Sequence, residues 1–510
     1  MKRTLKKLKG NKPGKIAKPS TVNSPDDMSL DYRRKFLEEK LGNSDDLVFR
    51  NIKVAEAKIC IVYIANLVDQ QKLNKFLLSP ITALSSVTID SLASTIPAPM
   101  LEIETNINVT VGGINGGSSL LLLDGAPEML VVGTAAEDYR AIAEPTDELV
   151  VRGPHEGLIE SLDKNIAMVR RKVRTDSFRM VDLTLGDYTG TRVGVCYIKG
   201  VAKDDVVDEV LKRLDQVDLD GILESGYLEE FIEDAPFSPF PTVGFTQKPD
   251  VVAGKMLEGR VAVFCDGTPV VLTVPFIFLE VFQTADDYYQ RPIFPSIIRV
   301  VRLLAAFIAV LLPATYVAIV NFHPDFLPTK LLLTIAASSE GVPFPKVVEV
   351  LLMGLIFEIL RESGLRIPTP MGQTISIVGA LVLGDAAVRA GLVGPPVIIV
   401  TALTAISSFV IHISMSGPMV LFRLVFIFSA AFMGLLGVSF AFLGVVIHLC
   451  SLRSFGVNYL SPIAPLETTA LKDTIVRIPW WMMLTRPRQI SRKEKRRDKG
   501  KRPRQVSMDD

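Results

Sequence analysis

The stretch 421-LFRLVFIFSAAFMGLLGVSFAFLGVVIHL-449 decides the broad class of this 510-residue chain. Its single Lys or Arg is Arg423, close to the start, and apolar residues dominate the rest of the stretch. A helix of about 20 apolar residues is long enough to cross the hydrocarbon core of a bilayer. The stretch therefore predicts a membrane-spanning helix with length to spare for tilt.

Apolar residues dominate from about 296 to 452, whereas the preceding residues have the mixed composition of a soluble protein. We predict four complete spans, at about 297–322, 374–392, 397–413 and 421–449. A further apolar stretch at 346–360 is short, contains Glu349 and Glu358, and is flanked by prolines. Irregular backbone at membrane depth must be covered by protein or water, so we expect a broken or re-entrant segment that lines a cavity. Residues 296–452 then form an all-α, multi-span transmembrane domain.

The residues before this domain predict an α/β fold in two subdomains, 31–149 and 150–250. In the first, KICIVYIANL at 58–67 has the composition of a buried strand, and a hairpin is expected around Asp124-Gly125. In the second, we expect helices at 156–173, 204–214 and 220–232 and a strand at 191–198. Residues 251–295 are predicted to hold a hairpin turning at Asp266-Gly267 and the junction with the membrane.

Both ends of the chain are basic: eight Lys or Arg lie in the first 18 residues and eleven between Arg486 and Arg504. Residues 1–30 predict a disordered arm, because they contain few apolar positions. Residues 453–510 predict an interfacial segment, anchored by Trp480 and Trp481, and a basic tail. A basic arm can bind nucleic acid or anionic lipid, or remain solvated; solvation is favoured, and lipid is favoured over nucleic acid. An even number of spans and the basic ends place both termini in the cytoplasm.

The sequence does not predict an enzyme, a cofactor site or a metal site. It contains no GxSxG, HExxH or Walker sequence, and its four histidines leave little for acid–base or zinc chemistry. The four cysteines are widely spaced in apolar runs, which indicates buried thiols in a reducing compartment. The glycine-rich residues 112–117 precede a strand rather than a Lys-bearing helix, which favours a mobile loop over a nucleotide site.

Several stretches resemble the GerA family of spore germination receptor A subunits. They are VRGPHEGLIESLDKNIAMVRRKV (151–173), the residues 239–292, the residues 334–396, YLSPIAPL (459–466) and IPWW (478–481). The resemblance runs from about residue 45 to 488. It implies an inner spore membrane protein with a cytoplasmic domain of two α/β subdomains, a transporter-like B subunit that binds the nutrient, and a lipoprotein C subunit as partners.

The same resemblance implies a homo-oligomer, a pentamer, that forms a nutrient-gated ion channel, most simply for cations. Two alternatives stay open. The stage V sporulation AF type is a related branch, for which a germination amplifier or scaffold without ligand binding is the corresponding function. A secondary transporter is the other, although it would require inverted repeats and about ten spans.

Carboxylates in or beside the short apolar stretch are the candidate ion path: Glu340, Glu349, Glu358 and Glu362. Repeated around an oligomer axis, each would form a ring attractive to cations. The alternative is local pairing of Glu349 with Lys346 and of Glu358 with Arg361.

A second candidate site lies where the soluble part meets the first predicted span. Its residues are Asp286, Asp287, Tyr288, Tyr289 and Arg291. We expect them either to couple the soluble domain to the membrane helices or simply to end a helix above the headgroups.

Overall fold

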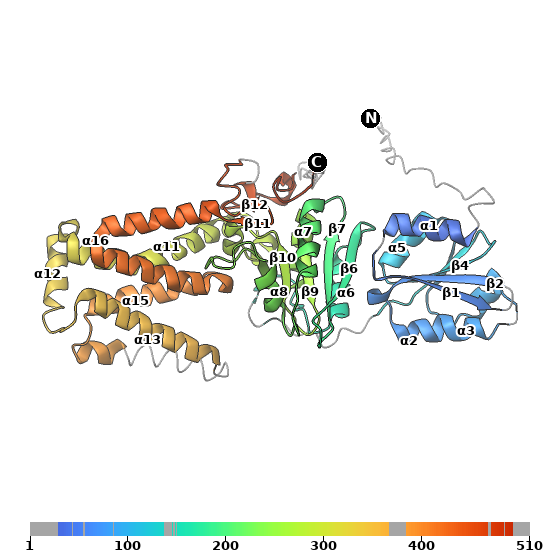
Figure 1. Ribbon diagram of the computed structural model, residues 1–510, viewed down its shortest axis with the longest axis horizontal. Helices are drawn as coiled ribbons and strands as arrows, with labels where there is room; N and C mark the ends of the chain where they lie inside the picture. The colour runs from blue at the N-terminus through green and yellow to red at the C-terminus, as the bar shows by residue number, and fades with distance from the viewer. Residues whose placement is uncertain are drawn as a thin grey trace, which may run out of the picture. The chain divides into compact units, whose positions relative to one another are not determined.

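The computed structural model describes residues 29–42, 44–54, 57–84, 86–136, 145, 148, 150–366, 384–467, 471–483 and 485–492 (Figure 1). The chain forms two compact units. One unit comprises Met1–Ile142, Ser161–Leu183 and Gly194–Lys199, and the other comprises Ala143–Glu160, Thr184–Val193 and Gly200–Asp510.

The first unit contains a five-stranded antiparallel sheet in the order β1-β2-β4-β5-β3. Its strands are β1 (Leu47–Val54), β2 (Ala57–Ile64), β3 (Leu101–Glu104), β4 (Ser119–Leu123) and β5 (Met129–Val132). Alternate residues of β2 enter two different cores, since successive side chains of a strand point to opposite faces. The predicted strand and the hairpin at Asp124-Gly125 are confirmed.

Helices cover both faces of this sheet (Figure 1). Those on one face are α1 (Leu30–Leu41) and α5 (Ile107–Asn115), which pack with Cys60, Val62 and Ile64. Those on the other are α2 (Gln70–Leu73), α3 (Ser79–Thr82) and α4 (Ile89–Thr95), which pack with Ile59, Ile61 and Tyr63. The same unit holds α6 (Leu162–Lys172).

A second set of five strands is ordered β6-β7-β9-β10-β8. These strands are β6 (Phe178–Leu185), β7 (Thr191–Ile198), β8 (Gly244–Thr246), β9 (Val261–Cys265) and β10 (Val271–Val274). The associated helices are α7 (Asp204–Asp215), α8 (Ser225–Ile232) and α9 (Pro249–Glu258). The β9–β10 hairpin turns at Asp266-Gly267 as predicted, with Gly267 at φ 89°. The helix expected at 156–173 begins later, at Leu162, because Leu158 donates its backbone N–H to the Gln247 carbonyl instead.

The described residues of the apolar part of the chain are mostly helical. Its helices are α10 (Asp286–Tyr289), α11 (Ile293–Phe322), α12 (Thr329–Ala337), α13 (Lys346–Arg366), α15 (Pro395–Ser408) and α16 (Ser416–Ser451). Within the described residues, two stretches could cross a membrane by length and composition, Ile293–Phe322 and Ile413–Ser451. The helix expected at 397–413 is shorter, because α15 ends at Ser408. Most of the span predicted at 374–392 lies outside the described residues.

The segment expected to be broken, 346–360, is a continuous helix in the structure. It forms the first part of α13, which has 21 residues and ends at Arg366. The neighbouring prolines 343 and 345 precede this helix, where a proline does not interrupt hydrogen bonding. Ion pairs between Lys346 and Glu349 and between Glu358 and Arg361 join successive turns.

The long apolar helix α16 folds back on itself at Gly434. A straight helix of its 36 residues would measure about 54 Å, yet Phe240 contacts both of its ends. The Phe240 ring lies 4.9 Å from that of Phe422 and 6.0 Å from that of His448. The predicted single span at 421–449 is therefore a helical hairpin of two antiparallel arms (Figure 1).

Only glycine fits at this turn. Gly434 has φ 58° and ψ −140°, a conformation that side chains make costly. A Cβ there would lie 2.9 Å from atoms of Phe322 and His323, at the end of α11. The chain continues after α16 through β11 (Arg453–Ser454), β12 (Val457–Asn458) and the 3-10 turns η7 (Leu471–Asp473) and η8 (Trp480–Met482).

Candidate functional site at the junction of the soluble and apolar segments

A buried carboxylate joins α10 to α11. Asp287 is 2% exposed and lies between two guanidinium groups of α11, which are three residues apart and therefore on one helix face. Arg299 Nε donates to Asp287 Oδ2 at 2.8 Å, and Arg302 Nη1 donates to the same carboxylate at 3.0 Å. The first three turns of α11 are thus held against the segment that leads out of the soluble sheet.

The segment after the last apolar helix completes this network. Asp473 accepts from Arg299 Nη1 at 3.1 Å and from the Tyr288 hydroxyl at 3.1 Å. Arg477 donates to the backbone carbonyls of Gln290 and Tyr288, just after and at the end of α10, at 3.0 and 3.3 Å. Two segments separated by about 180 residues in sequence, α10–α11 and η7, therefore share one buried charged cluster.

The electrostatics of the cluster depend on its cations. Burial raises the pKa of the Asp473 carboxyl and Glu258 adds to the rise, while Arg299 beside it opposes the rise. Burial also raises the pKa of the Tyr288 hydroxyl, which therefore keeps its proton and donates to Asp473. Removing a cation from this cluster would leave buried carboxylates without compensation.

The remaining predicted coupling residues lie around this cluster. Asp286 accepts weakly from the backbone N–H groups of Val151 and Arg152, at 3.4 and 3.2 Å. The Tyr289 hydroxyl donates to Asp250 at the start of α9. Arg291 is exposed. The structure thus brings Asp287 and Tyr288 together with α11, while Asp286 and Tyr289 contact the soluble part.

A second connection is made by the turn that comes after α16. Ser454 is fully buried; its hydroxyl donates to the Thr242 carbonyl at 2.7 Å and accepts from the Phe276 N–H at 2.9 Å. The guanidinium carbon of Arg213 lies 4.4 Å from the ring centroid of the neighbouring Phe455. The turn after the α16 hairpin therefore lies against the residues that precede β8 and follow β10, and against α7.

A third connection is made by the turn between α15 and α16. His412 Nε2 lies 3.8 Å from Glu148 Oε1, and the Thr246 hydroxyl donates to Glu148 Oε2 at 2.6 Å. Burial opposes ionisation of Glu148, but His412 and Thr246 outweigh it and lower the pKa of this carboxyl. Together with the first two, this contact ties three helix ends to the soluble part.

Of the four candidate ion-path carboxylates, Glu349 is the most enclosed. It is fully buried, accepts from Lys346 Nζ at 2.7 Å, and accepts from the Gly394 N–H at 2.8 Å. Gly394 is the N-cap residue of α15, where a negative charge is stabilised by the helix dipole. The expected pairing with Lys346 is confirmed, and Glu349 in addition joins α13 to α15.

Glu358 forms the pair expected with Arg361, at 3.1 Å, and another that sequence reasoning missed. Arg423 of α16, 6% exposed, donates to Glu358 at 3.0 Å and to the Ala309 carbonyl of α11 at 2.9 Å. This ion pair links α11, α13 and α16. Glu340 and Glu362 are exposed, and the ion-path role of all four carboxylates stays a prediction.

Sequence reasoning did not assign roles to Arg299, Arg302, Asp473 and Arg477, which form most of the charged cluster. Arg299 and Arg302 could have been found, because charged residues in an apolar helix need a partner. Asp473 carries no such signal, since it lies in a polar segment far along the chain. The partners of Asp473 can be identified only from the folded structure.

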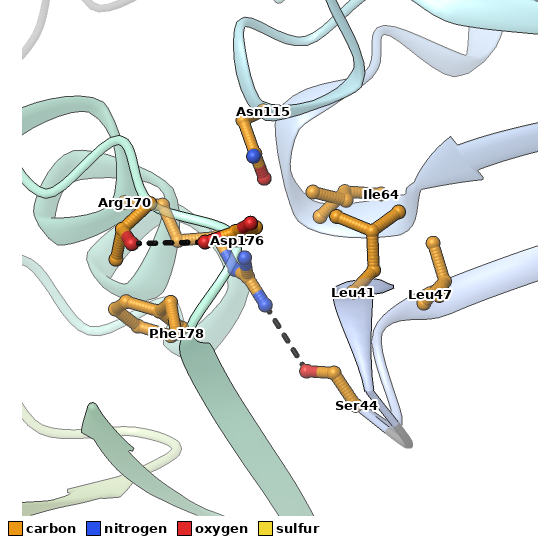
Figure 2. Close-up of a pocket in the computed structure, with 9 residues that line it drawn as sticks. Leu41, Ser44, Leu47, Ile64, Asn115, Arg170, Asp176 and Phe178 are labelled. Atoms are coloured by element: carbon orange, nitrogen blue, oxygen red, sulfur yellow. Dashed lines mark hydrogen bonds between the residues drawn. The ribbon is translucent and has the colours of Figure 1, made fainter. Parts of the chain in front are cut away.

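A cavity in the first unit is too small for a nutrient molecule. It measures about 10 Å³, roughly the space of one water, and is lined by residues that include Leu41, Ser44 and Asn115 (Figure 2). Arg170 points toward it, donating to Ser44 Oγ at 3.1 Å and to Asp46 at 2.8 Å. The cavity is part of a buried polar joint between the β1 end of the sheet and α6.

The fold and the junction together define a protein whose soluble α/β part is fastened by buried polar contacts to helices that could cross a membrane. Comparison with known proteins gives its family. The family described as Bacillus/Clostridium GerA spore germination protein matches residues 35–489. The chain belongs to the GerA family, which confirms the resemblance seen in the sequence.

Individual relatives are similar along most of the chain. It is 41% identical over 475 residues to Spore germination protein KA of Bacillus subtilis (strain 168), covering 91% of this chain and 87% of that protein. It is 37% identical over 475 residues to Spore germination protein B1 of the same organism, covering 90% and 97%. The crystal structure of the N-terminal domain of the A subunit of the Bacillus megaterium spore germinant receptor GerK3 is 34% identical, covers 49% of this chain and 96% of that chain, and has a TM-score of 0.37.

Proposed function

We propose that this protein is the A subunit of a spore germinant receptor in the inner spore membrane, where it opens an ion path in response to a nutrient. The observation that carries the proposal is the family match over residues 35–489, because it includes both the soluble part and the apolar helices. The protein acts as a receptor component rather than as an enzyme. A transporter-like B subunit and a lipoprotein C subunit are its expected partners.

Contacts of the C-terminal segment support a topology with both ends in the cytoplasm. The described end of the tail lies on the soluble part: the Arg492 N–H donates to the Val201 carbonyl at 2.9 Å, and its side chain pairs with Asp204. The fold-back at Gly434 also returns the chain to the junction after α16. These contacts support a topology in which the soluble part and the described end of the C-terminal segment are on one side of the proposed membrane region.

An ion path of this kind requires several copies around an axis, because one short helix per chain cannot enclose a pore. We infer a closed homo-oligomer, with the resemblance implying five copies. Glu349 and Glu358 are neutralised by Lys346 and Arg423 within one chain, whereas Glu340 and Glu362 have exposed side chains. Glu340 and Glu362 are accordingly the carboxylates best placed to attract cations from water.

The decisive experiment is complementation in spores that lack their own A subunits. The chain is expressed with its B and C partners, and nutrient-triggered cation release is measured alongside protein level in the inner membrane. Restored release that disappears without the B subunit supports the proposal. Germination that is only amplified, and that needs no B or C partner, favours the AF-type scaffold, while uptake of a solute by a monomeric chain favours the transporter.

A further inference from the structure

An exposed apolar surface surrounds the start of α11. Its members come from the first turns of α11 and from the segment after the last apolar helix: Ile293, Phe294, Ile297, Val476, Trp480 and Trp481. Each is between 43% and 77% exposed. Exposed apolar side chains that gather in one region favour a contact surface over ordinary surface variation. We call these six residues the collar.

The two parts of the collar are held together by polar contacts. The Ser296 hydroxyl accepts from the Arg477 N–H at 3.0 Å and donates to the Arg477 carbonyl at 3.2 Å. Trp480 Nε1 donates to the Tyr288 carbonyl at 3.3 Å, and the two rings are 5.8 Å apart. The collar is thus attached to α10, whose Asp287 binds the first turns of α11.

We propose that the collar is seated in the headgroup region of a bilayer and is occupied by anionic phospholipid. Continuity identifies the occupant, because Ile293, Phe294 and Ile297 belong to the helix that goes on to form one of the two candidate spans. Tryptophan prefers this depth, where its apolar body and its N–H are both accommodated. The proposal rests on the membrane location in the proposed function but not on receptor or channel activity.

Charge favours anionic headgroups at the rim of the collar. Arg291, directly before α11, and Lys472, whose carbonyl accepts from the Ile478 N–H, both have exposed side chains. A cation near a membrane surface adds about 1 kcal/mol of attraction to anionic lipid, which corresponds to about fivefold in local enrichment. The net negative charge of the headgroup is therefore what is recognised, since zwitterionic lipids carry the same phosphate diester.

The chain offers a direct probe, because it contains only two tryptophans and both belong to the collar. The full-length protein is reconstituted in vesicles whose phosphatidylcholine carries bromine either near the headgroup or near the bilayer centre. Shallow bromines are expected to quench tryptophan emission about twofold more than deep ones, since the half-thickness of the hydrocarbon core is about 15 Å. Trp480→Phe and Trp481→Phe each leave one tryptophan as the reporter. In both variants, shallow bromines should again quench more than deep ones.

Lipid class is tested in the same vesicles by exchanging brominated phosphatidylcholine for brominated phosphatidylglycerol at equal mole fraction. Brominated phosphatidylglycerol should quench tryptophan emission more strongly than brominated phosphatidylcholine. The double variant Arg291→Gln with Lys472→Gln should remove most of this difference. Equal quenching by both lipids would overturn the anionic preference. Quenching by aqueous iodide without quenching by lipid, or stronger quenching by deep bromines, would overturn the placement of the collar in the headgroup region. This holds even if the same vesicles show cation flux. Protection from both lipid and iodide would assign the surface to a protein contact instead.

Discussion

Replacing Asp287 by Asn is expected to loosen the junction between the soluble part and α11. The carboxylate is 2% exposed and accepts from two guanidinium groups, at 2.8 Å from Arg299 and 3.0 Å from Arg302. Asparagine has nearly the same shape but no charge, so both cations lose their shared partner. Breaking a buried ion pair from one side costs about 3–5 kcal/mol. Arg299 keeps its contact with Asp473, so we expect the lower end, about 3 kcal/mol.

The measurement is the thermal midpoint of the full chain in detergent, monitored by tryptophan emission at one scan rate because unfolding of such proteins is seldom reversible. Trp480 packs on Tyr288, next to the cluster, so its emission reports this region. Asp286→Asn is the matched control. Asp286 accepts only two long backbone hydrogen bonds, and its replacement should cost less than about 1 kcal/mol.

Asp287 and Arg302 are also expected to act as a pair. Removing both by Asp287→Asn with Arg302→Met should cost less than the sum of the single changes, because the second change removes a cation that the first left unpaired. If Asp287→Asn melts at the same temperature as Asp286→Asn, or if the two changes are strictly additive, the buried cluster does not hold the junction together.

Four further substitutions probe other parts of the fold. Glu358→Gln leaves Arg423 buried without a carboxylate and should cost about 3–5 kcal/mol of stability, whereas Glu362→Gln on an exposed position should change cation flux with little loss of folded protein. Gly434→Ala should lower the yield of folded protein by destabilising the fold-back by about 1–3 kcal/mol, measured against wild type by size-exclusion chromatography. Burial raises the pKa of the Glu229 carboxyl to about 7, so between about pH 4.5 and 7 the folded chain holds a proton that the unfolded chain has released. Stability should therefore fall as the pH rises through this window. Glu229→Gln should flatten this pH dependence of the thermal midpoint.

Local patterns in the sequence predicted several of the soluble elements but not others, such as β1, β3, β6 and β8. The continuous apolar run of β2 and the Asp-Gly turns of two hairpins are short-range features, and both are in the structure. The fold-back of α16 is different, because Gly434 stands among apolar residues on both sides and hydropathy does not distinguish one long helix from two arms. The signal lay in the length of the apolar run, which exceeds what one crossing needs.

The charged cluster at the junction could be predicted only in part. Coupling to the apolar helices was one of the two roles expected of Asp287, but the sequence did not identify Arg299 as the partner that the structure shows. Asp473 is 174 residues from Arg299, and its approach depends on the path of α16 and the turn after it. Contacts of this range require the whole fold, so no local pattern of residue types could identify them.

The pair formed by Glu358 and Arg423 changes how charge in the apolar helices of this chain should be interpreted. A carboxylate in an apolar helix indicates water or an ion only when no cation lies within reach, since burial of an unpaired charge is costly. Arg423 stood in another apolar helix, so the sequence already contained a compensating charge. The pair, at 3.0 Å and joined to the Ala309 carbonyl, fixes three helices relative to one another. Glu358 could serve an ion path only if Arg423 moved away from it. If Arg423 stayed in place, its positive charge would repel a passing cation. A cation path therefore fits Glu340 and Glu362 better than Glu358, and the contrast in flux between Glu358→Gln and Glu362→Gln separates the two arrangements.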